Sequence, residues 1–399
     1  MISLIQPSRN NLKYLKWSYS SIRKNAGSEV EICVADDFSN DGTWEWCQDM
    51  MKIDPNFKAI RNDGPTRLGH TILYDKLINE VATKDIVGIW HADMYMTPGT
   101  VEKIIATIEP GKIVSLTRIE PPLHPPGPEK VLMNFGIEPE EFNEDEFLSW
   151  YRAYVFTAMD KTTEGVFAPW FIYKSDFQSI EGHDSLFAPQ SKEDSDIFNR
   201  FLLNGYSFVQ LWDAAIYHMT CRGSRFNPTL TTPGQNSSEW SDQNMRSSRN
   251  FIRKWGHFVK HDMLMKPIVP PKYNIAFVIS KCNMQCLVDL EPWCDRTYID
   301  DDTHLLISTY LDKEQVNTKY DLSKRVLYTN QNDPKNENDI IVEFDATKLT
   351  QTSFNIIQQL SEILKDSGEV GVFELDCFTI TVNNLTEYQQ DLIICNTTY

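Results

Sequence analysis

An apolar run at residues 86–90 stops abruptly at His91-Ala92-Asp93, and a Thr-Pro-Gly turn and a helical stripe of apolar residues follow it. The run predicts a buried strand, and the stripe predicts a helix after the turn. Asp93 is therefore expected at the carboxyl end of a strand, which is the edge where open α/β sheets bind ligands. A carboxylate there can hold Mg2+ or Mn2+ through its oxygens, and the alternative is an Asp that only caps the turn.

The same order of elements runs through the first 110 residues. Each apolar run is followed by a polar loop and then by a helical pattern, at 2–6, 30–35, 57–61 and 86–90. Strict alternation of strands and helices predicts parallel strands joined by right-handed crossovers. We therefore expect an α/β, Rossmann-like nucleotide-binding half with a mostly parallel sheet.

The pattern changes after a further strand expected at 113–117. Residues 119–128 hold five prolines, which exclude regular helix and central strand, and an acidic and then an aromatic-rich stretch follows. We interpret residues 119–165 as an insertion over the ligand-binding edge, since long irregular segments in compact domains are commonly lids or binding loops. The alternative is a surface excursion without a role.

The rest of the first domain returns to strands and helices. A strand is expected at 168–174, a helix with an acidic start at 191–204, and strand character at 208–212 and 214–217 before His218. A helix at 244–260 is expected to close this domain, whose predicted extent is residues 1–265.

A proline-rich linker at 266–271 precedes a change in character. Residues 273–399 predict a smaller α+β domain, with expected strands that include 305–310 and 392–395 and a clear helix at 352–364. We find no catalytic motif in it, and its role is left open, with the formation of a homo-oligomer as one possibility.

Charge and composition exclude several classes of protein. The formal net charge is −18, which argues against general binding of nucleic acid or anionic membranes. No apolar stretch approaches the ~20 residues of a membrane helix, so no integral membrane segment is expected. Met1 leads into a strand without a signal peptide, and the scattered cysteines fit reduced thiols, so we expect a cytoplasmic protein.

Several motifs together resemble the family-2 glycosyltransferases of the GT-A fold, over roughly residues 1–260. LIQPSRN is similar to the family's first strand, VADDFSNDGTWE to its acidic donor loop, and HADMY to its D-x-D segment. KEDSDIFNRFLLNGY resembles its acidic helix, and IYHMTCRGSR its strand-end histidine and basic loop. The acidic donor loop is the most specific of these matches.

The resemblance implies a nucleotide-sugar donor bound with a divalent cation. Asp93 and His218 would hold Mn2+ or Mg2+, and the imidazole shifts the preference toward Mn2+. His91 stands where the family has the first acid of the D-x-D segment, so it is assigned to the donor site. Arg222 and Arg225 would reach the phosphate oxygens; alternatively, His218 is structural and the arginines are solvated.

Further donor contacts are expected at the ends of the first three strands. Asp36 or Asp37 would accept hydrogen bonds from the base or ribose, and Pro7 would shape the turn beneath them. Arg61 and Asp63 are assigned to the same pocket. The alternative for the acidic loop is a tight turn without a ligand.

Transfer with inversion requires a carboxylate that takes the proton of the attacking hydroxyl. We expect Asp194 to be this base, with Glu193 as the second candidate, and helix capping by both acids as the alternative. Asp196 is expected to face solvent or to pair locally. Trp170, Trp150 and Tyr151 are assigned to the acceptor site because aromatic rings stack on sugars, although such residues are as often core.

These assignments predict an inverting, metal-dependent glycosyltransferase of the hexosyltransferase-like EC 2.4 type, acting in polysaccharide biosynthesis. The donor is expected to be a UDP-sugar on the resemblance alone, and the acceptor a hydroxyl of a saccharide or glycoconjugate. One alternative is a nucleotidyltransferase, although the loop after the first strand lacks the glycines of that class. Another is a non-catalytic carbohydrate-binding or assembly protein with a decayed fold.

Overall fold

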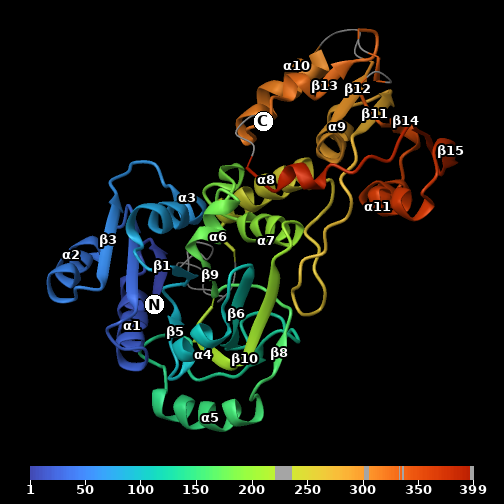
Figure 1. Cartoon of the computed structure of the whole chain (residues 1–399). Helices are drawn as coiled ribbons and strands as arrows, with labels where there is room; N and C mark the ends of the chain where they lie inside the picture. Colours follow the sequence, from blue (N-terminus) through green and yellow to red (C-terminus); the bar gives the residue numbers. More distant parts are fainter. Residues whose placement is uncertain (221–235, 301–304, 332, 335–336, 396–399) are drawn as a thin grey trace. The chain divides into compact units, whose positions relative to one another are not determined.

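The computed structural model describes residues 1–220, 236–300, 305–331, 333–334 and 337–395 (Figure 1). The chain divides into two compact units, one of Met1–Gln243 with His261–Ile268 and one of Asn244–Lys260 with Val269–Tyr399. Each unit is built on its own sheet. Among the described residues, none of the helices has both the length and the apolar character that spanning a membrane requires.

The first unit contains a ten-stranded sheet whose main path runs β3-β2-β1-β4-β9-β6-β10-β5, with β7 beside β6 and β8 beside β10. The strands are β1 (Ile2–Ser8), β2 (Glu31–Asp37), β3 (Phe57–Asn62), β4 (Ile86–Ile89), β5 (Met94–Tyr95), β6 (Lys112–Glu120), β7 (Val131–Leu132), β8 (Thr162–Thr163), β9 (Trp170–Tyr173) and β10 (Ser207–His218). β1 pairs in parallel with β2 and β4, β2 with β3, and β6 with β10. The predicted α/β architecture with a mostly parallel sheet is therefore confirmed.

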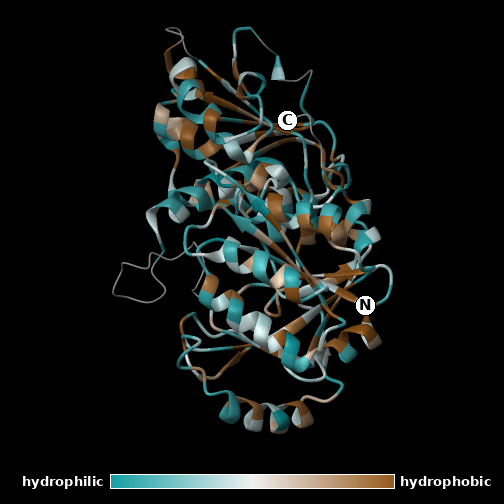
Figure 2. Cartoon of the chain, turned by 90° about the vertical axis from the view of Figure 1, so that its left-hand side faces the viewer, coloured by the Kyte–Doolittle hydropathy of each residue, from teal (hydrophilic) through white to brown (hydrophobic). Residues whose placement is uncertain are grey.

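Helices pack against the strands of this sheet. They are α1 (Leu12–Asn25), α2 (Thr43–Ile53), α3 (Gly69–Lys76), α4 (Thr100–Thr107), α5 (Glu144–Thr157), α6 (Lys174–Ser179) and α7 (Glu193–Leu203), and a π-helical turn, Leu77–Val81, continues α3. α2 contacts β3, α3 contacts β1, and α4 and α5 contact β10. Figure 2 shows the strands largely in the apolar colour, whereas the helices alternate apolar and polar residues, as packing on one face requires.

β10 is one continuous strand, where the sequence predicts two. Its pairing with β6 shifts register between Leu211 and Ala215, so the strand bends there and continues to His218. The polar residue Asp213, which interrupts the apolar pattern, lies in this bend and pairs with Lys103 at 2.6 Å. The bend carries the strand end to β5, with which it pairs antiparallel.

The predicted insertion contains a regular helix that its composition does not suggest. Asn143 caps α5 by accepting a hydrogen bond from the backbone N–H of Glu146 at 3.3 Å. The helix packs its aromatic rings against β10, and Phe142 beside it contacts Trp17 of α1 with ring centroids 5.2 Å apart. Much of the aromatic content of residues 119–165 therefore builds a core of its own.

The second unit has a six-stranded sheet in the order β13-β12-β11-β14-β16-β15. Its elements are α8 (Ser238–Trp255, shared with the first unit), β11 (Ile275–Ser280), α9 (Met284–Leu290), β12 (Arg296–Ile299), α10 (Leu305–Glu314), β13 (Val326–Tyr328), β14 (Ile340–Asp345), α11 (Gln351–Ser367), β15 (Gly371–Leu375) and β16 (Phe378–Val382). β13, β12, β11 and β14 are parallel to one another, and β16 and β15 are antiparallel. The unit is a mixed α/β structure with a parallel half.

Three predictions for this part of the chain are wrong. The apolar run expected as a strand at 305–310 begins α10. The last predicted strand, 392–395, is not a strand: a 3-10 turn, Gln389–Leu392, ends at its first residue, and bends follow. The helix predicted to close the first domain at 244–260 belongs to the second unit. Its Arg253 is buried and donates to Glu291 at 2.7 Å, and Arg325 donates to the same carboxylate at 2.8 Å. The buried pairing of Arg253 with Glu291 explains why this helix packs with the second unit.

Candidate functional site

The end of β4 and the end of β10 meet at one edge of the first sheet. The backbone N–H of Trp90 donates to the carbonyl of Ile5 at 3.1 Å, so the strand pairing continues one residue beyond β4. The chain then turns at His91-Ala92-Asp93 into β5, whose Met94 is the register partner of His218. The backbone N–H of Met219 donates to the carbonyl of Asp93 at 3.0 Å, which holds the two strand ends together.

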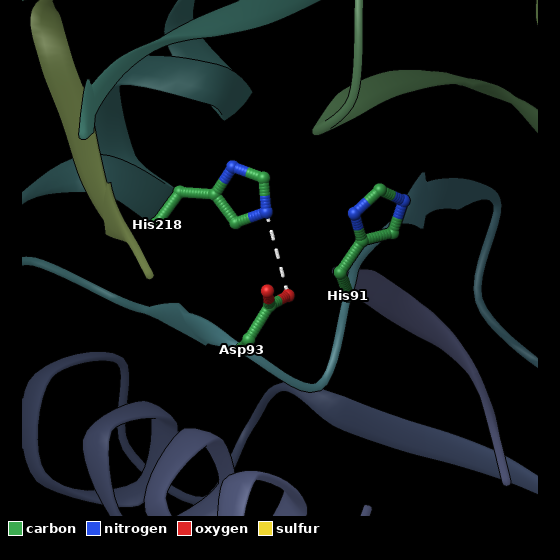
Figure 3. A group of neighbouring side chains, drawn as sticks. All are labelled: His91, Asp93 and His218. Carbon is green, nitrogen blue, oxygen red and sulfur yellow. Dashed lines mark ion pairs between the residues drawn. The ribbon is translucent and has the colours of Figure 1, made fainter. Parts of the chain in front are cut away.

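This pairing creates a cluster of two imidazoles and one carboxylate. His91, Asp93 and His218 each offer one ligand atom, and these atoms lie within 4.8 Å of one another. His218 Nε2 lies 3.4 Å from Asp93 Oδ1, and the dashed line in Figure 3 marks this ion pair. The predicted proximity of Asp93 and His218 is therefore present, and His91, which the sequence assigned to the donor, lies in the same cluster.

A fourth residue, Glu120, contacts the Nδ1 side of the His218 ring. It was not predicted from the sequence. Glu120 ends β6, and its Oε1 lies 2.8 Å from His218 Nδ1. Its carboxylate also pairs with Lys130 at 3.1 Å. The only signal in the sequence is an acid at the end of an apolar strand, and the parallel register of β6 with β10 is needed to place it beside His218.

The charges of the cluster are set by this arrangement. Burial disfavours an imidazolium at His218, but the carboxylates of Asp93 and Glu120 outweigh it and raise the pKa of His218 to about 9. Burial and the neighbouring His218 charge lower the pKa of His91 to about 4. The His218 imidazolium lowers the pKa of Asp93 although burial opposes this. Near neutral pH the carboxylate is ionised and His91 is neutral, while His218 carries a proton.

These residues fit a divalent cation. Two imidazole nitrogens and one carboxylate oxygen are a common ligand set for transition metals, and the closeness of the three atoms allows one ion to contact all of them. Glu120 at His218 Nδ1 leaves Nε2 facing Asp93, and a carboxylate behind a ligating histidine is the usual support for such a ligand. A cation would replace the proton of His218.

Two neighbouring acids at the end of β2, Asp36 and Asp37, make different contacts. Asp37 accepts hydrogen bonds from the backbone N–H groups of Leu68 at 3.0 Å and Gly69 at 2.8 Å, and from Asn62 at 2.7 Å. These contacts shape the loop between β3 and α3, so Asp37 is a structural residue here. Asp36 accepts one backbone hydrogen bond through Oδ1, and no hydrogen-bond partner of its buried Oδ2 lies among the described residues.

Asp36 is consequently the acid with an oxygen left for a ligand. Burial raises the pKa of Asp36, and the hydroxyl and backbone N–H of Ser39 and the charge of Arg61 partly offset this increase. Arg61 Nε lies 3.5 Å from Asp36 Oδ2 and 3.7 Å from Asp63 Oδ1. The Asp63 side chain is 90% exposed, so it lies at the rim. Pro7 is paired with Ala35 in β1 and β2, directly below this loop.

The acidic start of α7 contains one buried and one half-buried acid, Glu193 and Asp194. Among the residues that the structure describes, Glu193 Oε2 has no hydrogen-bond partner. Burial and the adjacent Asp194 raise the pKa of Glu193 to about 8. Burial also raises the pKa of Asp194, and the charge of His183 opposes this effect. Asp196 forms a buried ion pair with Arg200 at 2.9 Å. Of the two expectations for Asp196, exposure to solvent or local pairing, the second is therefore present.

Two of the three aromatic residues assigned to the acceptor do not offer a ring to a ligand. Trp170 is fully buried in β9, between β4 and β6, and packs edge-on against Phe198 of α7. Tyr151 is buried in α5, and its hydroxyl contacts Thr97 Oγ1 at 2.9 Å. Trp150 is half-buried and stacks on Tyr154 with ring centroids 5.0 Å apart. The assignment is thus corrected for Trp170 and Tyr151, because both fill the core.

The two arginines assigned to the phosphates, Arg222 and Arg225, lie outside the described residues.

The pattern of the first unit is matched by a known family. Residues 3–181 match the model of glycosyl transferase family 2. These residues are a family-2 glycosyltransferase domain. The matched segment of the family-2 domain includes β1 to β6, β9, His91 and Asp93, and it ends before α7.

Solved glycosyltransferases show a limited likeness to the chain. GalNAc-T7 with UDP, GalNAc and Mn2+ is 13% identical over 63% of this chain and 48% of its own, with a TM-score of 0.46. TarS 1–349 of S. aureus with UDP-GlcNAc is 16% identical over 61% and 64%, with a TM-score of 0.39. The mannosyltransferase PcManGT of Pyrobaculum calidifontis with GDP-Man and Mn2+ is 15% identical over 63% and 63%, with a TM-score of 0.41. The chain spans about half the length of GalNAc-T7.

The position of Glu120 makes a testable prediction about the cation. Glu120→Gln removes the charge that orients His218, so we expect Mn2+ affinity to fall roughly 10- to 100-fold with the fold retained. Isothermal titration of the purified protein with Mn2+ measures this. Glu102→Gln, at an exposed position of α4, is the matched control and leaves the affinity unchanged. Equal affinity of Glu120→Gln and the wild type would contradict the role of Glu120.

Proposed function

We propose that this protein is an inverting, divalent-metal-dependent glycosyltransferase that transfers a sugar from a nucleoside-diphosphate donor to a hydroxyl of a saccharide or glycoconjugate. The observation that carries the proposal is the convergence of three ligand side chains at one edge of the sheet. His91, Asp93 and His218 each offer one ligand atom, and these atoms lie within 4.8 Å of one another. One divalent cation could therefore contact all three.

The donor would lie between the acidic loop and the cation cluster. Within the described part of the chain, Asp36 has a buried oxygen without a hydrogen-bond partner, which suits an N–H of the base or a hydroxyl of the ribose. His91, Asp93 and His218 would hold the cation, with Mn2+ favoured over Mg2+ by the imidazoles. A bound cation would stabilise the negative charge that develops on the diphosphate as the sugar leaves. A UDP-sugar is the first donor to test, on the family resemblance.

Asp194 is the proposed base for the acceptor hydroxyl. Inversion requires that this hydroxyl attacks the anomeric carbon from the side opposite the diphosphate and loses its proton to a carboxylate. Glu193, with a pKa of about 8, is protonated at neutral pH, so it is the poorer base of the two.

Donor binding can be tested by thermal stability. We expect a UDP-sugar with Mn2+ to raise the melting temperature by a few degrees, because a ligand at 100 times its Kd stabilises the folded state by about 2.7 kcal/mol. The panel contains UDP-, GDP-, CMP- and dTDP-sugars, each with and without Mn2+. Asp93→Asn is expected to abolish the Mn2+-dependent part of the shift. A panel in which no nucleotide sugar changes the melting temperature would remove the donor assignment.

The base assignment is tested by separating binding from turnover. Asp194→Asn is expected to keep the donor-induced thermal shift. It is expected to lower the rate of sugar transfer, or the rate of donor hydrolysis where that is measured instead, by roughly 10²- to 10⁴-fold. Asp49→Asn, at an exposed site on α2, is the matched control and keeps full activity. Undiminished turnover in Asp194→Asn would exclude Asp194 as the base. A wild type that binds the donor without turning it over would favour the non-catalytic alternative.

A further inference from the structure

A third histidine, His70, borders the cation cluster without belonging to it. It lies in the first turn of α3, and its ring is stacked on that of His91, with the centroids 6.4 Å apart and an angle of 24° between the planes. Tyr74, one turn further along α3, lies 5.6 Å from the same ring between centroids. Two aromatic neighbours therefore hold the His70 ring beside a candidate cation ligand.

The ring nitrogens of His70 are left for a ligand. The residue is half-buried, and within the described ranges of the chain neither Nδ1 nor Nε2 has a hydrogen-bond partner. His218, by contrast, has Glu120 at Nδ1 and Asp93 at Nε2. An imidazole carries at least one N–H donor in either of its protonation states. The ring can therefore form a hydrogen bond to a bound molecule without first breaking one within the protein.

The backbone that carries His70 is fixed from two sides. On one side, the backbone N–H of Gly69 donates to Asp37 Oδ2 at 2.8 Å. On the other, the backbone N–H of Thr71 donates to the carbonyl of Pro189 at 3.4 Å. Only glycine allows this approach, because a Cβ on Gly69 would lie 2.1 Å from the carbonyl oxygen of Pro189 and its φ is +76°. The position of His70 is thus set by contacts within the protein.

His70 lies between the two parts of the candidate donor site. Through Gly69 it is attached to the end of β2, where Asp36 precedes Asp37, and through its ring it contacts His91 after the end of β4. β1 lies between β2 and β4 in the sheet, and α3 contacts β1. In a nucleoside diphosphate the ribose joins the base to the phosphates. A donor with its nucleoside at Asp36 and its diphosphate on the cation would therefore carry its ribose past the first turn of α3.

We propose that His70 forms a hydrogen bond with a ribose hydroxyl of the nucleotide donor and so favours ribonucleotides over nucleotides that lack this hydroxyl. A hydroxyl both donates and accepts, and it matches the donor and acceptor nitrogens of an imidazole, whereas an ionised phosphate oxygen only accepts. This inference rests on the proposed function. It adds a residue that determines specificity for the sugar of the nucleotide, and this residue belongs neither to the acidic loop nor to the cation cluster.

The contact is tested by removing it from the protein and from the ligand in turn. UDP and 2′,3′-dideoxy-UDP are each titrated by isothermal calorimetry at saturating Mn2+. His70→Phe keeps a ring against His91 and loses both nitrogens. We expect the preference for UDP over the dideoxy form to fall roughly 3- to 10-fold in this variant, the range for one hydrogen bond, with the affinity for the dideoxy form unchanged.

Three further proteins make the result specific. His70→Gln keeps a hydrogen-bond donor and is expected to retain part of the preference, whereas His70→Ala is expected to behave as His70→Phe does and serves if that variant does not fold. His261→Phe, at an exposed site, is the matched control and keeps the wild-type preference. Titration with Mn2+ alone is expected to give the wild-type affinity in every variant, because His70 is not a cation ligand in this account.

The possible outcomes separate this inference from the proposed function. An equal loss of affinity for UDP and its dideoxy form would indicate a contact with the phosphates or a disturbed cation site, and it would overturn the role of His70. An unchanged preference would overturn it as well. The same titrations with GDP and 2′,3′-dideoxy-GDP extend the test to a purine nucleotide. A wild type that binds neither UDP nor GDP with Mn2+ would contradict the proposed function itself, and the role of His70 with it.

Discussion

The candidate site depends on His218 lying between two carboxylates. β10 delivers this residue, and the pairing of β10 on both sides fixes where it lies. The parallel register with β6 places Glu120 at Nδ1, and the antiparallel register with β5 places Asp93 at Nε2. A slip of one residue would turn the imidazole to the other face of the sheet, so the site requires this register.

Four of the ten described non-glycine residues with a positive φ lie next to candidate site residues. Phe38 follows the acidic pair of β2 with a φ of 60°, and Thr220 follows the end of β10 with a φ of 50°. Ser191 and Lys192, immediately before Glu193 and Asp194 of α7, have φ of 81° and 71°. Side chains other than glycine rarely adopt this conformation, and such residues cluster at functional sites. The fold tolerates three strained turns at the points where it presents acids or an imidazole.

Much of the first unit could be predicted from the sequence, because an apolar run that ends in an acid indicates both a strand and the position of its C-terminal end. Asp93 was placed in this way, and His218 and the acidic start of α7 were assigned through the family resemblance. Glu120 was missed, because its position beside His218 depends on the pairing of two strands that are distant in the chain. Trp170 and Tyr151 were misassigned, since aromatic content alone does not distinguish a stacking platform from a core.

The second unit shows why local patterns are insufficient. The apolar residues at 305–310 fit a strand as well as a helix, and the chain resolves the ambiguity through packing: Ile307 and Tyr310 are buried in α10. The helix at 244–260 was placed by its position in the sequence, whereas the buried pairing of Arg253 with Glu291 assigns it to the later unit. Such ion pairs form between elements that are distant in the sequence, so the sequence of either segment alone does not indicate them.

The central claim is that the ends of β4 and β10 jointly bind a cation that carries the donor diphosphate. Anomalous diffraction at the manganese absorption edge, from crystals of the protein with Mn2+ and UDP, tests it most directly. The account predicts one peak in contact with His91, Asp93 and His218 and with the phosphate oxygens. A bound UDP with no manganese among these three side chains would contradict it.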